Sequence, residues 1–181
     1  MNELSVDDLA RCLGVPRERA AVWAAPLNAA MQQYGITTPQ RQAAFLAQIG
    51  HESARLRYVR ELWGPTPAQR RYEGRKDLGN VQPGDGKRFM GRGLIQVTGR
   101  ANYARCAQAL GLPLLERPQL LEQPEHAANS AGWFWQSNGL NVYADRGDFI
   151  GLTRRINGGI NGLADRQALW VRCKKVLGVQ P

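Results

Sequence analysis

The sequence predicts a mainly α-helical protein with a small sheet element. Its 181 residues are enough for one sizeable domain and too few for two comfortable ones. Capping residues, glycines and prolines recur along the chain at helix-length intervals, with apolar residues at helical spacing between them. One stretch, LIQVT at residues 94–98, instead alternates with the period of two that is typical of a strand.

The N-terminal segment, residues 1–37, is expected to be helical. Ser5 can cap a first helix that Gly14 ends. Pro16 suits the first turn of a second helix. Pro26 is expected to break or kink this second helix, because proline lacks a backbone donor.

Residues 38–181 are expected to complete the same domain, with room for a small helical lobe. Thr38 and Pro39 are the cap and first residue of a helix, and the Gly- and Pro-rich run at residues 64–87 predicts a long structured loop with one short helix. Later helices are expected at about residues 101–110, 117–122, 125–137, 147–156 and 162–177.

The charge balance predicts a polyanionic partner. The chain has 24 Lys and Arg against 15 Asp and Glu, a net charge of +9 and a pI near 10.1. Such a surface attracts nucleic acid, anionic lipid headgroups or an anionic cell wall. No basic helix-turn-helix, zinc-finger or aromatic RNA-binding pattern is present, which argues against nucleic acid.

The cysteines and the N-terminal sequence predict folding in a reducing cytoplasm. The first residues, MNELSVDDLARCLG, lack the basic start and apolar core of a signal peptide. Cys12, Cys106 and Cys173 are expected to be buried small apolar residues. Neither His51 nor His126 has metal-ligand spacing to a cysteine, so no zinc site, metal or cofactor is expected.

Two glutamates are the first candidates for chemistry. Glu52 follows directly on an apolar helix, so its carboxyl is expected to be partly desolvated, which favours the protonated form that a general acid needs. Nine residues of continuous helix would place Glu61 about 13 Å further along the axis. The sequence after Leu56 predicts a change of direction that lets the two carboxyls face each other. Inverting glycosidases need roughly 6.5–9.5 Å between their carboxyls, which leaves room for a water.

The expected strand supplies further polar groups. Its alternation places Gln96 and Thr98 on one face. Gln96 could bind the N-acetyl or hydroxyl groups of a sugar, and the Thr98 hydroxyl could hold the attacking water against Glu61. Asn102 and Tyr103 begin a helix nearby. A plain strand with polar residues facing solvent remains an equal alternative on these residues alone.

Several motifs together carry a family resemblance. They are GHES at 50–53, YVRE at 58–61, YEGRKDLGN at 72–80, GKRFMGRGLIQVTGRANY at 86–103 and TRRINGGINGLADR at 153–166. The ordered set resembles family 19 of the glycoside hydrolases, the chitinase family that also contains phage and prophage endolysins. The resemblance covers about residues 38–170. It implies a lysozyme-like helical fold with a substrate cleft between two lobes.

The resemblance also implies residue roles. Glu52 corresponds to the general acid, Glu61 to the general base and Thr98 to the residue that positions the water. Arg166 matches an arginine that orients the base. Glu73 is a rival second carboxylate, or a residue that pairs with an arginine or lines the sugar site.

Four further residues match substrate-contacting or site-shaping positions of this family. Gln96, Asn102 and Tyr103 follow the GRG motif, and Asn157 of the INGG segment matches a substrate-binding asparagine. We interpret all four as candidate substrate-binding residues.

The implied activity is inverting hydrolysis of a β-1,4-linked N-acetylated glycan. The leading hypothesis is an endolysin that cuts peptidoglycan between N-acetylmuramic acid and N-acetylglucosamine. A chitinase is the alternative, and a non-catalytic wall-binding protein is a third reading. We expect a monomer made in a bacterial cytoplasm without a separate wall-binding module. It would be released by a holin into the periplasm and bind the anionic wall or outer membrane.

Overall fold

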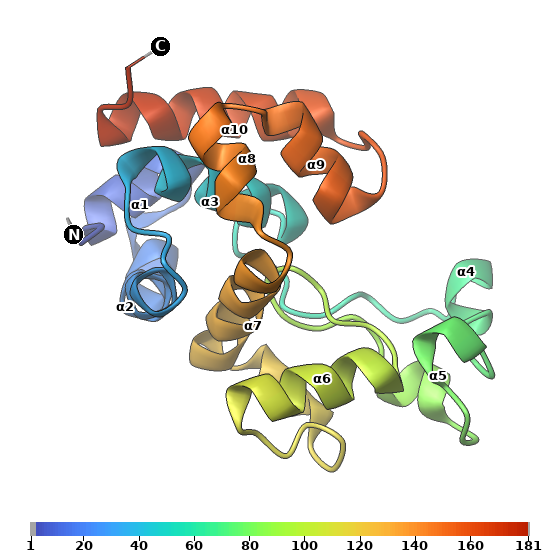
Figure 1. Cartoon of the computed structure of the whole chain (residues 1–181). Coiled ribbons are helices and arrows are strands. Elements are labelled where there is room, and N and C mark those ends of the chain that lie inside the picture. Colours follow the sequence, from blue (N-terminus) through green and yellow to red (C-terminus); the bar gives the residue numbers. More distant parts are fainter. Residues whose placement is uncertain (1–2, 181) are drawn as a thin grey trace.

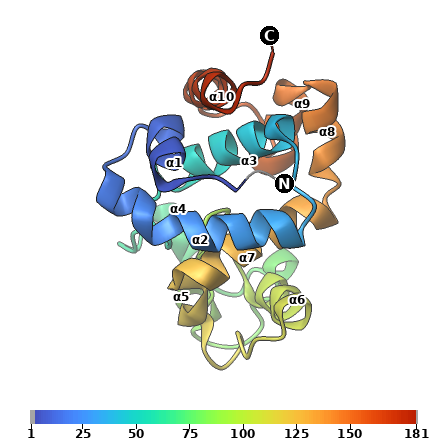
Figure 2. The ribbon, with the colours of Figure 1, turned by 90° about the vertical axis from the view of Figure 1, so that its left-hand side faces the viewer.

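The computed structural model describes residues 3–180, and this part of the chain is mainly helical, as predicted. Its larger lobe contains α1 (Val6–Leu13), α2 (Arg17–Gln33), α3 (Pro39–Glu52), α8 (Leu140–Arg146), α9 (Phe149–Asn157) and α10 (Leu163–Leu177) (Figures 1 and 2). The smaller lobe contains α4 (Pro67–Arg70), η1 (Lys76–Leu78), α5 (Asp85–Arg88), α6 (Arg100–Leu110) and η2 (Pro118–Glu122).

The lobes have separate hydrophobic clusters, and α7 (Pro124–Ser137) joins them. The larger cluster draws on α1, α2, α3, α7, α8, α9 and α10. The smaller cluster includes Phe89, Tyr103 and Leu121, and Trp133 of α7 packs against both clusters. In Figure 1, α7 extends from the larger body towards α6. A buried helix shared by two cores fixes the lobes relative to each other.

The predicted helix starts of the larger lobe are confirmed. The Ser5 side chain accepts a hydrogen bond from the backbone of Asp8, and Gly14 ends α1 with a φ of 65°. The Thr38 hydroxyl accepts from the backbone of Arg41 at 3.2 Å and caps α3.

The predicted break at Pro26 is wrong, because α2 continues through this residue to Gln33. Proline removes only one backbone donor, and buried side chains on both sides of it anchor the helix. Trp23 precedes Pro26 and Leu27 follows it, both within the core. Tertiary burial therefore outweighs the local penalty of the proline.

The predicted strand at residues 94–98 is also wrong. Arg92 and Val97 form an isolated antiparallel bridge, and the residues between them make a tight turn that includes Gly93 at a φ of 99°. A second bridge pairs Arg92 with Arg60. The sheet element is thus reduced to two bridges. Burial follows the predicted alternation only in part: Leu94, Ile95 and Val97 are buried, whereas Gln96 is exposed.

Two other segments differ from the expectation. The sequence did not predict α8, a helix of seven residues between Gly139 and Gly147. The loop at residues 64–87 contains parts of three short helices, α4, η1 and α5, instead of one. One-turn helices bury too few side chains to leave a periodic pattern in the sequence.

The three cysteines are buried and free, as predicted. Within residues 3–180, no cluster of three or more His, Cys, Asp or Glu side chains is placed to hold a metal ion. In the same range, no helix combines the length and the apolar character needed to cross a membrane.

Candidate active site

Glu52 is the last residue of α3, and the chain turns sharply after it. Ala54, Arg55 and Leu56 have φ angles of 49°, 60° and 62°, a left-handed run that L-residues disfavour by roughly 1–2 kcal/mol each. Ser53 holds this turn, because its hydroxyl donates to Ile49 O at 2.6 Å and accepts from Leu56 N at 2.8 Å. A change of direction was predicted after Leu56; the structure places it earlier, over residues 53–56, directly after the end of α3.

The Glu52 carboxylate forms an ion pair with a buried arginine. Arg166 Nη2 lies 2.7 Å from Glu52 Oε1, and the arginine side chain is 1% exposed. Arg166 Nη1 also donates to Gln48 Oε1 at 2.6 Å, and Gln48 Nε2 donates to the Thr153 hydroxyl at 3.0 Å. This buried polar network joins α3, α9 and α10 beneath Glu52.

The structure corrects the expected partners of Glu61. Arg166 was expected to orient Glu61, but it contacts Glu52. Arg60, the chain neighbour of Glu61, reaches another carboxylate: its guanidinium lies 3.7 Å from Glu122. The reason for the Arg60 placement is strand-like alternation: adjacent residues of an extended segment point to opposite faces.

A second charged cluster lies next to Glu52. Asp165 accepts from Arg55 Nη2 at 2.6 Å and lies 2.7 Å from His51 Nδ1. The Arg55 hydrogen bonds, and secondarily His51, lower the pKa of Asp165 from its ordinary 3.8 to about 2, although partial burial acts in the opposite direction. This cluster ties the left-handed turn to α10. The sequence analysis missed Arg55 and Asp165 because only tertiary folding brings them together.

Backbone pairing fixes the position of Glu61. Its N–H donates to Gly91 O at 2.9 Å, and Gly93 N donates to Val59 O at 2.8 Å. The segment that carries Glu61 therefore lies beside the GRG motif, thirty residues away in sequence.

Three uncharged donors hold the Glu61 carboxylate. Gln69 Nε2 donates to Oε1 at 2.9 Å, while Gly91 N at 2.9 Å and the Tyr72 hydroxyl at 3.4 Å donate to Oε2. Burial, and then the Glu61 carboxylate, raises the pKa of Tyr72, so this hydroxyl remains a donor at neutral pH. Gln69 and Tyr72 come from the loop at residues 64–87. No motif or periodic pattern in the sequence indicates either contact.

Gly91 lets Glu61 and Gln96 approach the same place. A Cβ added at Gly91 would lie 2.5 Å from Gln96 Oε1 and 2.7 Å from Glu61 Oε2, distances that real Cβ atoms do not show. The exposed Gln96 thus lies beside the carboxylate, where it can contact a ligand of Glu61.

Thr98 lies opposite Gly91. Arg92 and Val97 exchange both backbone hydrogen bonds, so antiparallel register makes Gly91 and Thr98 the next facing pair. Asn102 Nδ2 donates to Thr98 O at 2.8 Å and holds this backbone in place.

Tyr103 cannot bind substrate directly, which corrects the expectation that it does. The Tyr103 side chain is fully buried. Its hydroxyl donates to Met90 O at 2.6 Å and accepts from Arg92 Nη1 at 3.1 Å. It therefore shapes the site by holding the backbone next to Gly91.

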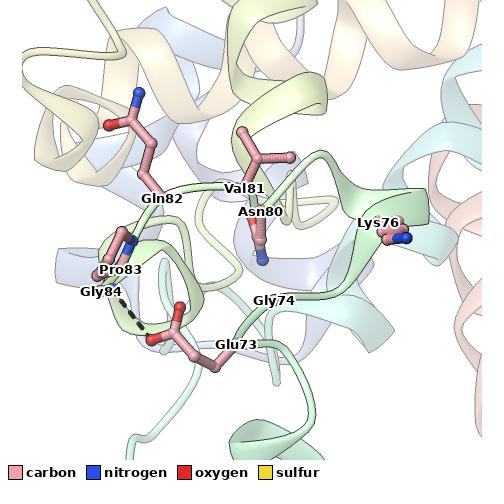
Figure 3. Close-up of a pocket in the computed structure, with 8 residues that line it drawn as sticks. All are labelled: Glu73, Gly74, Lys76, Asn80, Val81, Gln82, Pro83 and Gly84. Atoms are coloured by element: carbon pink, nitrogen blue, oxygen red, sulfur yellow. Dashed lines mark hydrogen bonds between the residues drawn. The ribbon is translucent and has the colours of Figure 1, made fainter.

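The remaining candidates, Glu73 and Asn157, are not among the hydrogen-bond partners of the Glu61 carboxylate in residues 3–180. Glu73 is exposed and accepts from Gly84 N at 3.1 Å at the edge of a surface hollow (Figure 3). No ion pair within residues 3–180 includes Glu73, so the expected arginine partner is not seen. Asn157 ends α9 with an exposed side chain.

A hollow of about 430 Å³ borders the Glu61 segment. Its lining includes Glu61, Trp63, Lys87 and Met90. Trp63 and Tyr72 have ring centroids 6.2 Å apart, so aromatic surface accompanies the carboxylate. The site combines partly exposed carboxylates, each with its own hydrogen-bond or ion-pair partners, with an amide and aromatic rings. Such groups suit polar ligands that also have apolar faces, such as sugars.

Comparisons with known proteins agree on one family. A family model described as class I chitinase (Glyco_hydro_19) matches residues 20–145. A Haemophilus influenzae protein described as a glycosyl hydrolase family 19 domain-containing protein is 32% identical over 171 residues, which cover 80% of this chain and 84% of that protein. An Arabidopsis thaliana endochitinase is 39% identical over 126 residues, which cover 69% of this chain and 42% of that protein.

Solved structures resemble the whole chain. A bacterial family 19 chitinase superposes with a TM-score of 0.78 at 25% identity, over 99% of this chain and 97% of that one. Chitinase C from Streptomyces griseus gives a TM-score of 0.75 at 25% identity, over 97% of this chain and 76% of that one. These matches confirm the fold that the sequence motifs imply.

Proposed function

Because the chain belongs to glycoside hydrolase family 19, the class I chitinase family, we propose that it is an inverting hydrolase of bacterial peptidoglycan. It cuts the β-1,4 bond between N-acetylmuramic acid and N-acetylglucosamine. The observation that carries the proposal is the Glu61 carboxylate, which three uncharged donors hold beside the exposed Gln96.

Glu61 is proposed as the general base. Its oxygens accept from Gln69, Tyr72 and Gly91, and no cation within residues 3–180 forms an ion pair with this carboxylate. An oriented carboxylate can take a proton from a water and stabilise positive charge on the sugar ring. Thr98, opposite Gly91, is proposed to hold that water.

Glu52 is proposed as the general acid. The contact of Arg166 with Oε1 leaves Oε2 to carry the proton that the glycosidic oxygen receives. The buried network behind Arg166 fixes the direction of this carboxyl. Hydrolysis then proceeds in a single displacement, in which one water attacks as the leaving oxygen is protonated.

The basic surface supports an anionic polymer as substrate. A net charge of +9 attracts the carboxylates of a bacterial wall, whereas chitin carries no such groups. We propose an endolysin that acts in the periplasm after holin-dependent release and binds the wall or outer-membrane surface as a monomer. No cofactor takes part in this mechanism.

A chitinase is the second candidate, and the relatives favour it. Seven plant relatives are named endochitinases, and the chain spans 34–56% of their lengths. The solved neighbours are also named chitinases. The same pair of carboxylates would serve either polymer.

The test compares purified peptidoglycan with glycol chitin, using wild type and Glu52→Gln. We expect wild type to release muropeptides with reducing N-acetylmuramic acid, identified by mass spectrometry, and Glu52→Gln to lose at least about 10²-fold in rate. Cleavage of glycol chitin alone would replace the muramidase proposal with the chitinase. Equal rates for both proteins would remove the catalytic role of Glu52.

A further inference from the structure

A second hollow lies on the loop that supports Glu61. Its volume is about 590 Å³, against about 430 Å³ for the hollow that borders Glu61. Eight residues between positions 73 and 84 line it (Figure 3). An added Cβ at Gly74 or Gly84 would meet no atom within 4 Å, so the space over both glycines is open.

The frame of this hollow is held by buried polar contacts. Asn80 is 1% exposed, and its amide donates to Tyr72 O and accepts from Arg100 N. Arg100 also makes two hydrogen bonds of 2.8 Å to the buried Asp85, whose side chain accepts from Gln82 N. These contacts fasten the loop to the start of α6. A hollow held in this way is preformed, which lowers the entropic cost of binding.

The groups around the hollow differ in chemistry. Val81 is 74% exposed and presents an apolar surface to a ligand. In the view of Figure 3, Lys76 lies at the right-hand edge of the labelled group and Glu73 lies at its lower side. Glu73 uses only Oε2 to accept from Gly84 N, and neither residue belongs to an ion pair among residues 3–180. The hollow thus offers an anion, a cation and an apolar surface.

The hollow is connected directly to the proposed base. Tyr72, whose hydroxyl donates to Glu61 Oε2, is the chain neighbour of Glu73. A ligand in the hollow would therefore lie one residue along the chain from a donor that contacts Glu61, the residue that a bound glycan would reach. A substituent on that glycan is the occupant that this placement favours.

We propose that this hollow binds the stem peptide of the peptidoglycan strand that is cut at Glu61. Stem peptides carry carboxylates, alanine methyl groups and, on their diamino acid, an ammonium group. Lys76 pairs with a stem carboxylate, Glu73 with the ammonium group, and Val81 contacts the methyl groups. The inference rests on the proposed peptidoglycan substrate and names the part of the substrate that distinguishes it from chitin.

The experiment compares intact peptidoglycan with glycan strands from which an amidase has removed the stem peptides. We expect wild type to show a kcat/KM about tenfold higher on the peptide-bearing polymer. Lys76→Met should lower this ratio about three- to fivefold, the effect of losing one exposed ion pair. Lys175→Met, which removes an exposed cation of α10, controls for the general loss of charge and should leave the ratio unchanged.

Direct binding gives an independent readout. A soluble stem tetrapeptide should shift the methyl NMR signals of Val81 in wild type, with a Kd that rises about three- to fivefold in Lys76→Met. Equal wild-type kcat/KM values on both polymers, together with unshifted Val81 signals, would overturn the inference and leave the muramidase proposal standing. Cleavage of neither polymer, with cleavage of glycol chitin, would overturn both.

Discussion

Because Gly91 has no side chain, Glu61 Oε2 and Gln96 Oε1 can lie in the space that a Cβ would need. Gly91 also donates its N–H to Glu61 and pairs its carbonyl with the Glu61 backbone. One residue without a Cβ therefore sets the position of the proposed base. Its φ is not positive, so the requirement is one of space and not of backbone conformation.

Gly91→Ala should reduce activity with little effect on folding. The new methyl would displace the Glu61 carboxylate by a few tenths of an ångström or more, and misplacement of a catalytic group by about 1 Å can cost ~10²-fold in kcat. Steady-state assay and thermal unfolding measure the two effects. We expect a Tm within about 4 °C of wild type.

Gly159→Ala is the matched control. An added Cβ there would meet only Asn157 Oδ1, at 3.7 Å, which is ordinary contact. If Gly91→Ala retains wild-type kcat, the carboxylate of Glu61 either moves freely or does not act in the rate-limiting step.

Tyr103→Phe should destabilise the protein. The variant leaves Arg92 Nη1 without one acceptor and Met90 O without its 2.6 Å donor, both in a buried place. Losing such a pair costs about 1–3 kcal/mol. Urea unfolding of the variant measures the change, and an unaltered free energy of unfolding would show that water replaces the hydroxyl.

At the scale of single residues, the sequence predicted the carboxylates better than their supports. Glu52 and Glu61 stood out because each follows a recognisable motif. The partners of Glu61 did not: Gln69 and Tyr72 come from an irregular loop, and Gly91 contributes a backbone N–H that no side-chain pattern reports. Arg166 was identified but assigned to the wrong carboxylate, because sequence spacing does not say which charges meet.

The end of α3 shows how elements bring these residues together. The left-handed run after Ser53 redirects the chain towards the GRG segment, and Asp165 of α10 clamps it through Arg55. This clamp joins the end of one helix to the start of another. Its stability is therefore linked to the charge of Asp165.

Asp165→Asn should lower stability at neutral pH and flatten its acid dependence. The folded-state pKa of Asp165 is about 2 against an ordinary 3.8, so the unfolded state binds more protons between these values. The stabilisation is present above about pH 4 and is lost as the pH falls towards 2. Because the Asp165 carboxylate is 38% exposed, solvent screening reduces the size of this stabilisation.

Urea unfolding of both proteins from pH 2 to pH 7 measures this dependence. The difference in the free energy of unfolding should shrink towards pH 2. Asp7→Asn, which removes an exposed ion pair with Arg17, is the control and should change stability by less than about 1 kcal/mol. A wild-type–variant difference that stays constant with pH would contradict the clamp.

At the scale of elements, the helices with clear caps could be predicted and the short elements could not. The starts of α1 and α3 follow from Ser5 and Thr38, whose side chains bond locally. The prediction at Pro26 was wrong because burial on both sides of the proline preserves α2. The prediction for LIQVT was wrong because a tight turn, like a strand, can bury Ile95 and Val97 and expose Gln96 between them. Local sequence lacks the long-range contacts that decide such cases.

At the scale of the molecule, the two proposed catalytic groups have different origins. Glu52 ends a helix of the larger lobe, whereas Glu61 lies on the bridged segments that lead to α4 and α5 (Figure 1). The two lobes are joined by α7, which packs into both hydrophobic clusters through residues that include Trp133, so the proposed shared site would depend on this helix. The mainly helical architecture was predictable from composition and capping, while this shared helix was not.

The stereochemistry of the first product tests the central claim most directly. A base and an acid that share one bond and one water must invert the attacked carbon. Proton NMR during the first turnovers of a soluble β-1,4-linked oligosaccharide substrate should therefore show the α-anomer at the new reducing end. Initial formation of the β-anomer would mean a covalent, retaining mechanism and would contradict the roles proposed for Glu52 and Glu61.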